Sequence, residues 1–196
     1  MRFGPSLKPA FYERPTVEVA RALLGKVLVH GAAAGMIVET EAYLGGDDRA
    51  AHSARGITPR TRVIFGPPGH AYVYLIYGMY ECLNLVCEPE GKPGCVLVRA
   101  LEPLAGIPLM RQRRGGSDGA SRRDEDLAAG PGKLTVAMGI TRAHNGVDVT
   151  RGSLVVREMA EAVRPEVQVT ARIGITECAD LPLRFLVRGN RFVSRK

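Results

Sequence analysis

The chain contains one dense run of aromatic residues, Ala71-Tyr72-Val73-Tyr74-Leu75-Ile76-Tyr77-Gly78-Met79-Tyr80, which holds four of its six tyrosines. Because alternate side chains of a β-strand share a face, Tyr72 and Tyr74 are predicted to point one way and the aliphatic residues beside them the other. Gly78 lacks a Cβ and accepts positive φ, so a tight reversal is expected there. The apolar residues that follow predict the return strand of a hairpin, with Tyr77 exposed near its tip.

An aromatic ring at a hairpin tip can wedge between stacked bases when the rest of the protein is built for nucleic acid. The formal net charge of +7 favours a polyanionic partner. A basic enzyme without such a partner has the same charge, so composition alone does not separate the two classes. With 196 residues, 45% of them hydrophobic, the chain can bury a core and is expected to form one domain, residues 1–196.

The sequence carries no signal for a membrane or an oxidising compartment. No continuous apolar stretch follows the first five residues, and no segment approaches the roughly 20 apolar residues that span a bilayer. The four cysteines show no Cys-x-x-Cys spacing, which predicts reduced thiols rather than a metal site or a disulfide framework. A cytoplasmic protein with no membrane partner is expected.

Strand patterns outnumber helix patterns along the chain, which predicts a mostly antiparallel α+β domain. Helices are expected at 16–24, at 107–114 and from Gly130-Pro131 to Gly139. Strands are expected at 26–30, 36–44 and 95–100, on both arms of the tyrosine hairpin, and around residues 154, 167, 173 and 183–187. Residues 111–125 are polar, glycine-rich and basic, which predicts a flexible loop that either touches phosphates or is simply solvated.

Candidate chemistry lies in residues 37–44. As a strand, this segment would place Ile37, Glu39, Glu41 and Tyr43 on one face, while alternate residues 38–44 face the core. Residues 47–53 could form a short helix that begins with two acids and carries His52 back towards Tyr43. The arrangement supplies a proton acceptor and two flat rings that can hold a planar ligand.

The same residues are also compatible with plainer interpretations. Two carboxylates on a strand are usually a solvated face. A metal centre at Asp47, Asp48 and His52 lacks a second histidine at ligand spacing, so no metal is expected. Residues 130–134 do not form a phosphate-binding loop, because position 127 is leucine and Lys133 is followed by leucine.

A long series of motifs runs through the chain in order. They are Glu39-Thr40-Glu41-Ala42-Tyr43, Ala51-His52-Ser53, Thr58-Pro59-Arg60, residues 65–74, Tyr77-Gly78-Met79-Tyr80, Cys82-Leu83-Asn84, residues 98–103, residues 130–134, residues 182–185 and Gly189-Asn190. This series resembles the alkyladenine (3-methyladenine) DNA glycosylase family and covers nearly the whole chain. Ile57, Thr61 and Ala129 depart from residues common in that family, and none of them is the proposed carboxylate.

The resemblance implies a monofunctional DNA repair N-glycosylase that flips out alkylated or deaminated purines, such as 3-methyladenine, 7-methylguanine and hypoxanthine. It implies a compact domain with a curved sheet, flanking helices and a protruding hairpin that inserts into DNA. The expected partner is double-stranded DNA with a damaged purine, the expected state a monomer, and no cofactor is expected. The location would be the nucleoid in a bacterium or the nucleus in a eukaryote.

The resemblance also assigns roles by motif. Glu41 would activate the water that attacks the sugar, and Arg99 would help to place that water or a nearby phosphate. Tyr77 would fill the gap in the duplex. The base pocket would be formed by Tyr43, His52, Tyr72, Tyr74 and Asn84, and DNA backbone contacts would come from Thr58, Arg60, Gly78, Met79 and Lys133.

Some of these residues have plainer explanations. Asn84 could satisfy backbone groups at a strand end. Arg99, among apolar neighbours, could instead form an ion pair with Glu39 or Glu102. Two other functions also use the tyrosines: a non-catalytic single-stranded nucleic-acid-binding module with a stacking platform, and a hydrolase of small nucleosides. The first has no need of Glu41, and the second no need of the positive charge or an exposed Tyr77.

Overall fold

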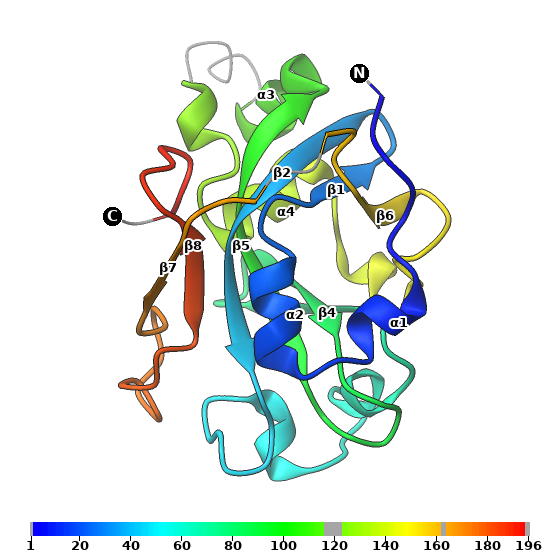
Figure 1. Ribbon diagram of the computed structural model, residues 1–196, viewed down its shortest axis with the longest axis vertical. Helices are drawn as coiled ribbons and strands as arrows, with labels where there is room; N and C mark the ends of the chain where they lie inside the picture. The colour runs from blue at the N-terminus through cyan, green and yellow to red at the C-terminus, as the bar shows by residue number, and fades with distance from the viewer. Residues whose placement is uncertain (1, 116–122, 162–163, 195–196) are drawn as a thin grey trace.

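The computed structural model describes residues 2–115, 123–161 and 164–194 and is built on a curled antiparallel sheet (Figure 1). The strands run in the order β3-β4-β5-β2-β1-β6, and β8 joins β2 to β7. Their bounds are β1 Val27–His30, β2 Ala33–Tyr43, β3 Ala71–Ile76, β4 Tyr80–Val86, β5 Cys95–Ala105, β6 Leu154–Arg157, β7 Val167–Thr170 and β8 Arg184–Val187. The predicted α+β class with a mostly antiparallel sheet is confirmed.

The long strands β2 and β5 pair with each other and form the middle of the sheet. Both exceed their predicted lengths, because β1 and β2 are joined by a two-residue turn with His30 opposite Ala33, and β5 continues five residues past Ala100. Ala42 faces the main core as predicted. Leu44, also expected in the core, follows the end of β2 and is exposed.

The described helices are α1 Pro9–Tyr12, α2 Thr16–Ala22, α3 Ile107–Gly115 and α4 Pro131–Met138. Helix α4 begins and ends as predicted, with Pro131 in its first turn and Gly139 in the left-handed region at φ 71°. Helix α2 packs on β2, and α4 packs on β4 and β5. Both helices contribute side chains to the main hydrophobic core, which also contains residues from most of the strands.

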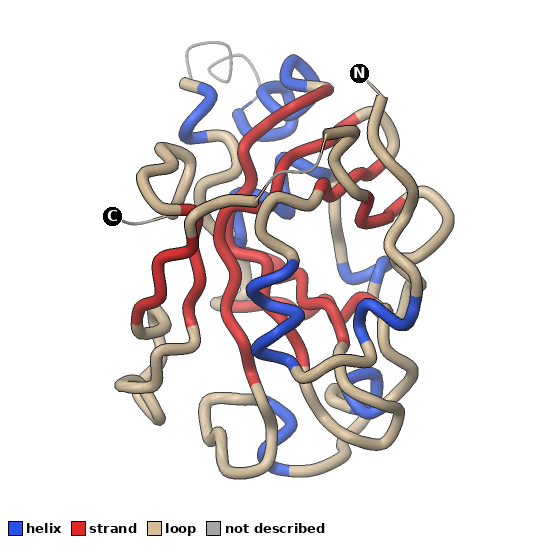
Figure 2. Tube along the Cα trace, in the orientation of Figure 1, coloured by secondary structure: helices blue, strands red, loops and turns tan. Residues whose placement is uncertain are grey.

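Short 3-10 helices occur in the connections between these elements. They are η1 His52–Arg55, η2 Arg62–Phe65, η4 Asp124–Asp126 and η5 Arg142–His144. The long connection from β2 to β3 contains η1 and η2 and forms the lower end of the molecule in Figures 1 and 2. No helix within the described ranges has the length and apolarity needed to cross a membrane.

Three segments differ from expectation or lie partly outside the described chain. The strand predicted around Ile173 is wrong, because its backbone N–H donates to a side chain instead of a ladder. The short helix predicted at 47–53 is also wrong, since η1 starts only at His52 and Asp48 binds a distant arginine. Of the predicted loop at 111–125, residues 111–115 belong to α3, residues 124–126 form η4, and residues 116–122 lie outside the described residues.

Candidate active site

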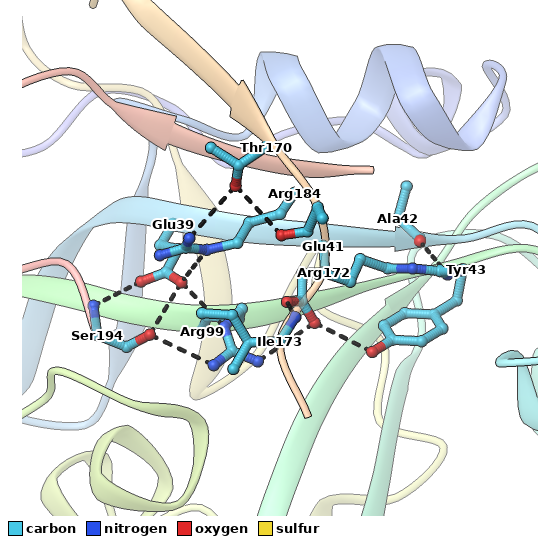
Figure 3. Close-up of polar contacts among 11 residues, drawn as sticks. Glu39, Glu41, Ala42, Tyr43, Arg99, Thr170, Arg172, Ile173, Arg184 and Ser194 are labelled. Atoms are coloured by element: carbon cyan, nitrogen blue, oxygen red, sulfur yellow. Dashed lines mark hydrogen bonds and ion pairs between the residues drawn. The ribbon is translucent and has the colours of Figure 1, made fainter. Parts of the chain in front are cut away.

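The site is built on the second half of β2, where a β-bulge changes the faces of the strand. Glu39, Glu41 and Tyr43 lie on one face, as predicted (Figure 3). Ile37, predicted to share that face, packs into the main core instead, and Val38 packs in a second cluster on the other side. The register shifts on both sides of Glu39, and an extra residue in one strand exchanges the faces of the residues before it.

The carboxylate of Glu41 is fully buried and accepts three hydrogen bonds. Its Oε2 accepts from the Tyr43 hydroxyl at 3.0 Å and from Arg99 Nη1 at 3.2 Å, and its Oε1 accepts from the Ile173 N–H at 2.8 Å (Figure 3). Burial raises the pKa of Glu41, and the charge of Arg99 and the two neutral donors only partly offset this. Glu41 therefore holds a proton more tightly than an exposed glutamate does.

Arg99 lies between two carboxylates. Its Nε donates to Glu39 Oε1 at 2.9 Å, and its Nη1 donates to Glu41. Burial disfavours the charge of this guanidinium, but the carboxylates of Glu41 and Glu39 outweigh that and raise its pKa. Glu102, the other expected partner, instead accepts from Asn190 Nδ2 at 2.8 Å.

A second buried ion pair, which the sequence did not reveal, supports the other side of the site. Arg172 binds Asp48 through two nitrogens at 2.7 and 2.8 Å, donates to the Ala42 carbonyl at 3.0 Å and lies 4.7 Å from the centre of the Tyr43 ring. These contacts anchor the segment whose next residue, Ile173, donates to Glu41. The two partners are 124 residues apart, and no local pattern marks either of them.

A cavity of about 340 Å³ opens beside these groups. It is lined by Tyr43, Ala50, His52, Tyr72, Tyr74, Ile76, Tyr77, Cys82, Asn84, Cys95, Leu97, Arg99, Pro131, Ile173, Gly174 and Ile175. The lining therefore includes every residue that the motifs assign to the base pocket. Glu41 lies directly behind the wall, because the three residues that donate to it all line the cavity.

Aromatic rings from two elements meet on one side of the cavity. The His52 ring stands 4.7 Å from Tyr74 and 6.1 Å from Tyr72, close to perpendicular to both, and its Nδ1 lies 3.0 Å from the Tyr72 hydroxyl. Arg60 donates to the same hydroxyl at 3.2 Å and lies over the Tyr74 ring. Burial against these rings, with the charges of Arg60 and Arg55, lowers the pKa of His52 to about 4, so it is neutral near pH 7.

The lining of the cavity also includes one amide and two thiols. Asn84 Nδ2 donates to the Tyr72 carbonyl at 3.3 Å, so this side chain both satisfies a backbone group and lines the cavity. Cys82 and Cys95 are buried and free, and burial raises the pKa of both thiols. These thiols are protonated at neutral pH.

The tip of the β3–β4 hairpin has the expected form. Ile76 pairs with Tyr80, which leaves a three-residue turn. Both Tyr77 and Gly78 have positive φ, 52° and 67°, and the side chains of Tyr77 and Met79 are 77% and 70% exposed. Tyr77 also borders the cavity, so one exposed ring stands at its mouth.

The chain is similar over nearly its whole length to proteins of one family. The family model described as methylpurine-DNA glycosylase (MPG) matches residues 10–191. A protein of Methanoculleus marisnigri is 55% identical over 97% of this chain and all of its own length, and one of Methanocella arvoryzae is 49% identical over 98% and 97%. One of Rhodopseudomonas palustris is 47% identical over 98% and 89%. All three bear the name "Putative 3-methyladenine DNA glycosylase".

The chain belongs to the methylpurine-DNA glycosylase family. The resemblance inferred from the motifs is thereby confirmed.

Beside the ring-lined cavity lies a smaller basic cavity of about 300 Å³. It is lined by Arg49, Ala50, Ala51, His52, Arg55, Thr58, Arg60 and Thr61, a set without any acidic side chain. The two cavities share Ala50 and His52. The predicted backbone-contacting residues Thr58 and Arg60 thus lie at the basic cavity, while Lys133 is exposed in the first turn of α4 beside Pro131 of the main cavity.

In the described ranges of the chain, no three His, Cys, Asp or Glu side chains are grouped so that they could hold a metal ion.

Proposed function

We propose that the protein excises alkylated or deaminated purines from double-stranded DNA by hydrolysing the N-glycosidic bond, which leaves an abasic site. The purines in question are those of the 3-methyladenine, 7-methylguanine and hypoxanthine class. Membership of the methylpurine-DNA glycosylase family and the names of three relatives over nearly their full lengths support the reaction. The enzyme would act as a monomer without a cofactor, on chromosomal DNA in the cytoplasm or nucleus.

The single observation that carries the proposal is the buried Glu41 carboxylate behind the wall of a ring-lined cavity. Its Oε2 is held by Tyr43 and Arg99, whereas Oε1 accepts only the Ile173 N–H among the described residues and so retains a lone pair. A water bound there could be deprotonated as it attacks the sugar C1′, and the raised pKa of Glu41 makes it a better base than an exposed glutamate. The same negative charge would stabilise an oxocarbenium-like transition state.

The cavity suits a planar and positively charged base. Its volume of about 340 Å³ is within the range of small-molecule sites, and Tyr43, Tyr72, Tyr74 and His52 present flat surfaces. Alkylation of a ring nitrogen makes a purine cationic, and aromatic faces attract cations. Because His52 is neutral near pH 7, it adds a stacking surface without repelling that charge. The cationic base is also a good leaving group, so one carboxylate can suffice.

Tyr77 would take the place of the extruded base in the duplex. Rotating a nucleotide out of the stack costs a few kcal/mol, and stacking on an inserted aromatic ring is worth about 1–3 kcal/mol. The exposed ring at the mouth of the cavity is positioned for this exchange, with Gly78 and Met79 beside it on the turn. The ring that fills the gap in the duplex and the cavity that receives the extruded purine would then be adjacent.

The basic cavity would hold the phosphates next to the extruded nucleotide. Arg49, Arg55 and Arg60 line it together with the Thr58 hydroxyl, and it adjoins the base cavity through His52. Lys133 would contact the backbone from α4. Contacts of this kind bind DNA without reading sequence, and they weaken as salt rises.

Release of free base from methylated duplex DNA tests the proposal. With enzyme in excess, the wild type should release 3-methyladenine, and Glu41→Gln should lower the rate by about 10²–10⁴-fold because a general base is lost. Binding of the methylated duplex should persist, since the substituted side chain is buried behind the cavity wall.

Glu102→Gln is the matched control, because it removes a carboxylate of β5 that bonds to Asn190 rather than to Arg99. Its rate should equal that of the wild type. Unchanged turnover in Glu41→Gln would exclude Glu41 as the base. Strong binding of single strands without any release of base would favour a binding module over an enzyme.

A further inference from the structure

Glu39 is a buried carboxylate beside the site that does not line the cavity. It is fully buried and accepts four hydrogen bonds (Figure 3). Its Oε1 accepts from Arg99 Nε at 2.9 Å, Arg184 Nε at 2.8 Å and Ser194 Oγ at 2.9 Å, and its Oε2 accepts from the Ser194 N–H at 2.6 Å. These donors come from β5, from β8 and from the segment after β8.

The guanidinium of Arg99 is thereby fixed on three sides. Nε is bound to Glu39, Nη1 to Glu41 and Nη2 to Ser194 Oγ at 3.3 Å. Only one of its nitrogens reaches Glu41, although an arginine fork facing a carboxylate commonly binds with two. The pull of Glu39 and Ser194 accounts for this single contact.

We propose that Glu39 is a positioning residue of the excision reaction: it shares Arg99 with Glu41, so that Glu41 keeps an open lone pair and enough negative charge to act as the base. This inference rests on the proposed function. Without Glu39, the Arg99 fork would be free to turn towards Glu41, bind both of its oxygens and occupy the place of the attacking water.

The charges around Glu41 support the same role for Glu39. The groups that face it are Glu39 and Tyr43 of β2, Arg99 of β5, Cys82 of β4, Arg184 opposite it on β8, and Arg172 after β7. Arg172 has its own partner in Asp48, whereas Arg99 is shared by Glu39 and Glu41. Loss of the charge of Glu39 leaves Glu41 as the charged partner of Arg99. Since Glu39 raises the pKa of Glu41, its removal should lower that pKa and weaken the base.

The experiment measures single-turnover release of 3-methyladenine from methylated duplex as a function of pH, normalised to folded protein. Glu39→Gln keeps the shape of the side chain and removes its charge. We expect the plateau rate to fall about 10- to 100-fold and the acidic limb of the profile to move to lower pH, while binding of the duplex stays within about twofold. A purely structural role would lower the melting temperature and leave the plateau and the limb where they are in the wild type, which would overturn the inference.

Ser194→Ala provides a second, milder variant in case Glu39→Gln does not fold. It removes one donor to Glu39 and the acceptor of Arg99 Nη2, so Arg99 can turn towards Glu41 while the charge of Glu39 remains. We expect a fall of a few-fold and a smaller shift of the limb in the same direction. A wild-type plateau and limb in this variant would contradict the inference.

Two controls separate the possible failures. Glu102→Gln removes a carboxylate that is tied to Asn190 near the same chain segment, and it should leave the profile unchanged. If Glu41→Gln keeps full activity, the proposed function itself fails. If Glu41→Gln is inactive while folded Glu39→Gln matches the wild type, only the role of Glu39 fails.

Discussion

The buried charge cluster of the site (Glu39, Glu41, Arg99 and Arg172) and the tip of the hairpin are built in opposite ways. In this charge cluster every side chain is buried and has an oppositely charged hydrogen-bond partner. At the tip, Tyr77 is largely exposed and its backbone adopts a positive φ that a non-glycine residue rarely takes. Both the desolvation of charges and the left-handed backbone lower stability, but in the charge cluster internal partners offset the loss.

The two regions differ in whether their partners lie within the chain or outside it. The charges of the cluster are paired within the chain, so their geometry is fixed before any ligand binds. The ring at the tip has few contacts to lose and a flat surface to offer, which suits a group that acts against a partner. Substitutions in the charge cluster should therefore change the stability of the fold, and substitutions at the hairpin tip should change ligand binding.

The largest effect on stability is expected from Asp48→Asn. This change leaves the buried guanidinium of Arg172 without its opposite charge, and breaking a buried ion pair in this way costs about 3–5 kcal/mol. Urea denaturation would measure the free energy of unfolding. Glu166→Gln is the control, because its pair with Arg188 is exposed and should be worth less than about 1 kcal/mol. Equal losses of unfolding free energy in the two variants would contradict the contrast between the buried charge cluster and the surface.

A smaller effect, on binding alone, is expected from Tyr77→Ala. Loss of the ring should weaken binding of methylated duplex by about 1–3 kcal/mol, where 1.4 kcal/mol is tenfold in Kd. The free energy of unfolding should change by no more than about 0.5 kcal/mol, since the side chain is exposed. Tyr77→Phe keeps the ring and should bind like the wild type. An equal loss on undamaged duplex would argue against insertion of the ring.

The smallest effect concerns His52, which lines the cavity together with Arg99 and Tyr77. An NMR titration of its imidazole should show a midpoint near pH 4 rather than the ordinary value of 6.5, because the ring is packed against Tyr74 and Tyr72 and faces Arg60 and Arg55. The unfolded chain then takes up this proton first, so the contribution of His52 to stability is lost as pH falls from about 6.5 towards 4. Arg60→Gln should raise the midpoint. A midpoint of 6.5 in the wild type would show that the ring is not desolvated.

Features set by neighbours in sequence could be predicted. The hairpin follows from strict alternation around Tyr72 and Tyr74 and from a glycine at the turn, and the ends of α4 follow from Pro131 and Gly139. The co-location of the motif residues in one cavity came from the family resemblance, because spacing alone does not bring His52 to the tyrosines.

Features set by distant parts of the chain could not be predicted. The bulge that moves Ile37 to the core depends on how β2 pairs with both β5 and β8. Ile173 lies in an apolar segment that looks like a strand, but its N–H is taken by a carboxylate 132 residues away. The fourfold coordination of Glu39 likewise requires segments that follow it by 60 to 155 residues. Polar side chains that bond across such separations leave no periodic trace.

The two thiols that line the cavity have a consequence for how the protein resists chemical modification. Reagents that methylate purines are electrophiles, and the species in a protein that reacts most readily with electrophiles is a thiolate. Cys82 and Cys95 are kept out of water and retain their protons at neutral pH. Under the proposed function, the enzyme would meet such reagents with these cavity thiols held in the form that reacts poorly with them.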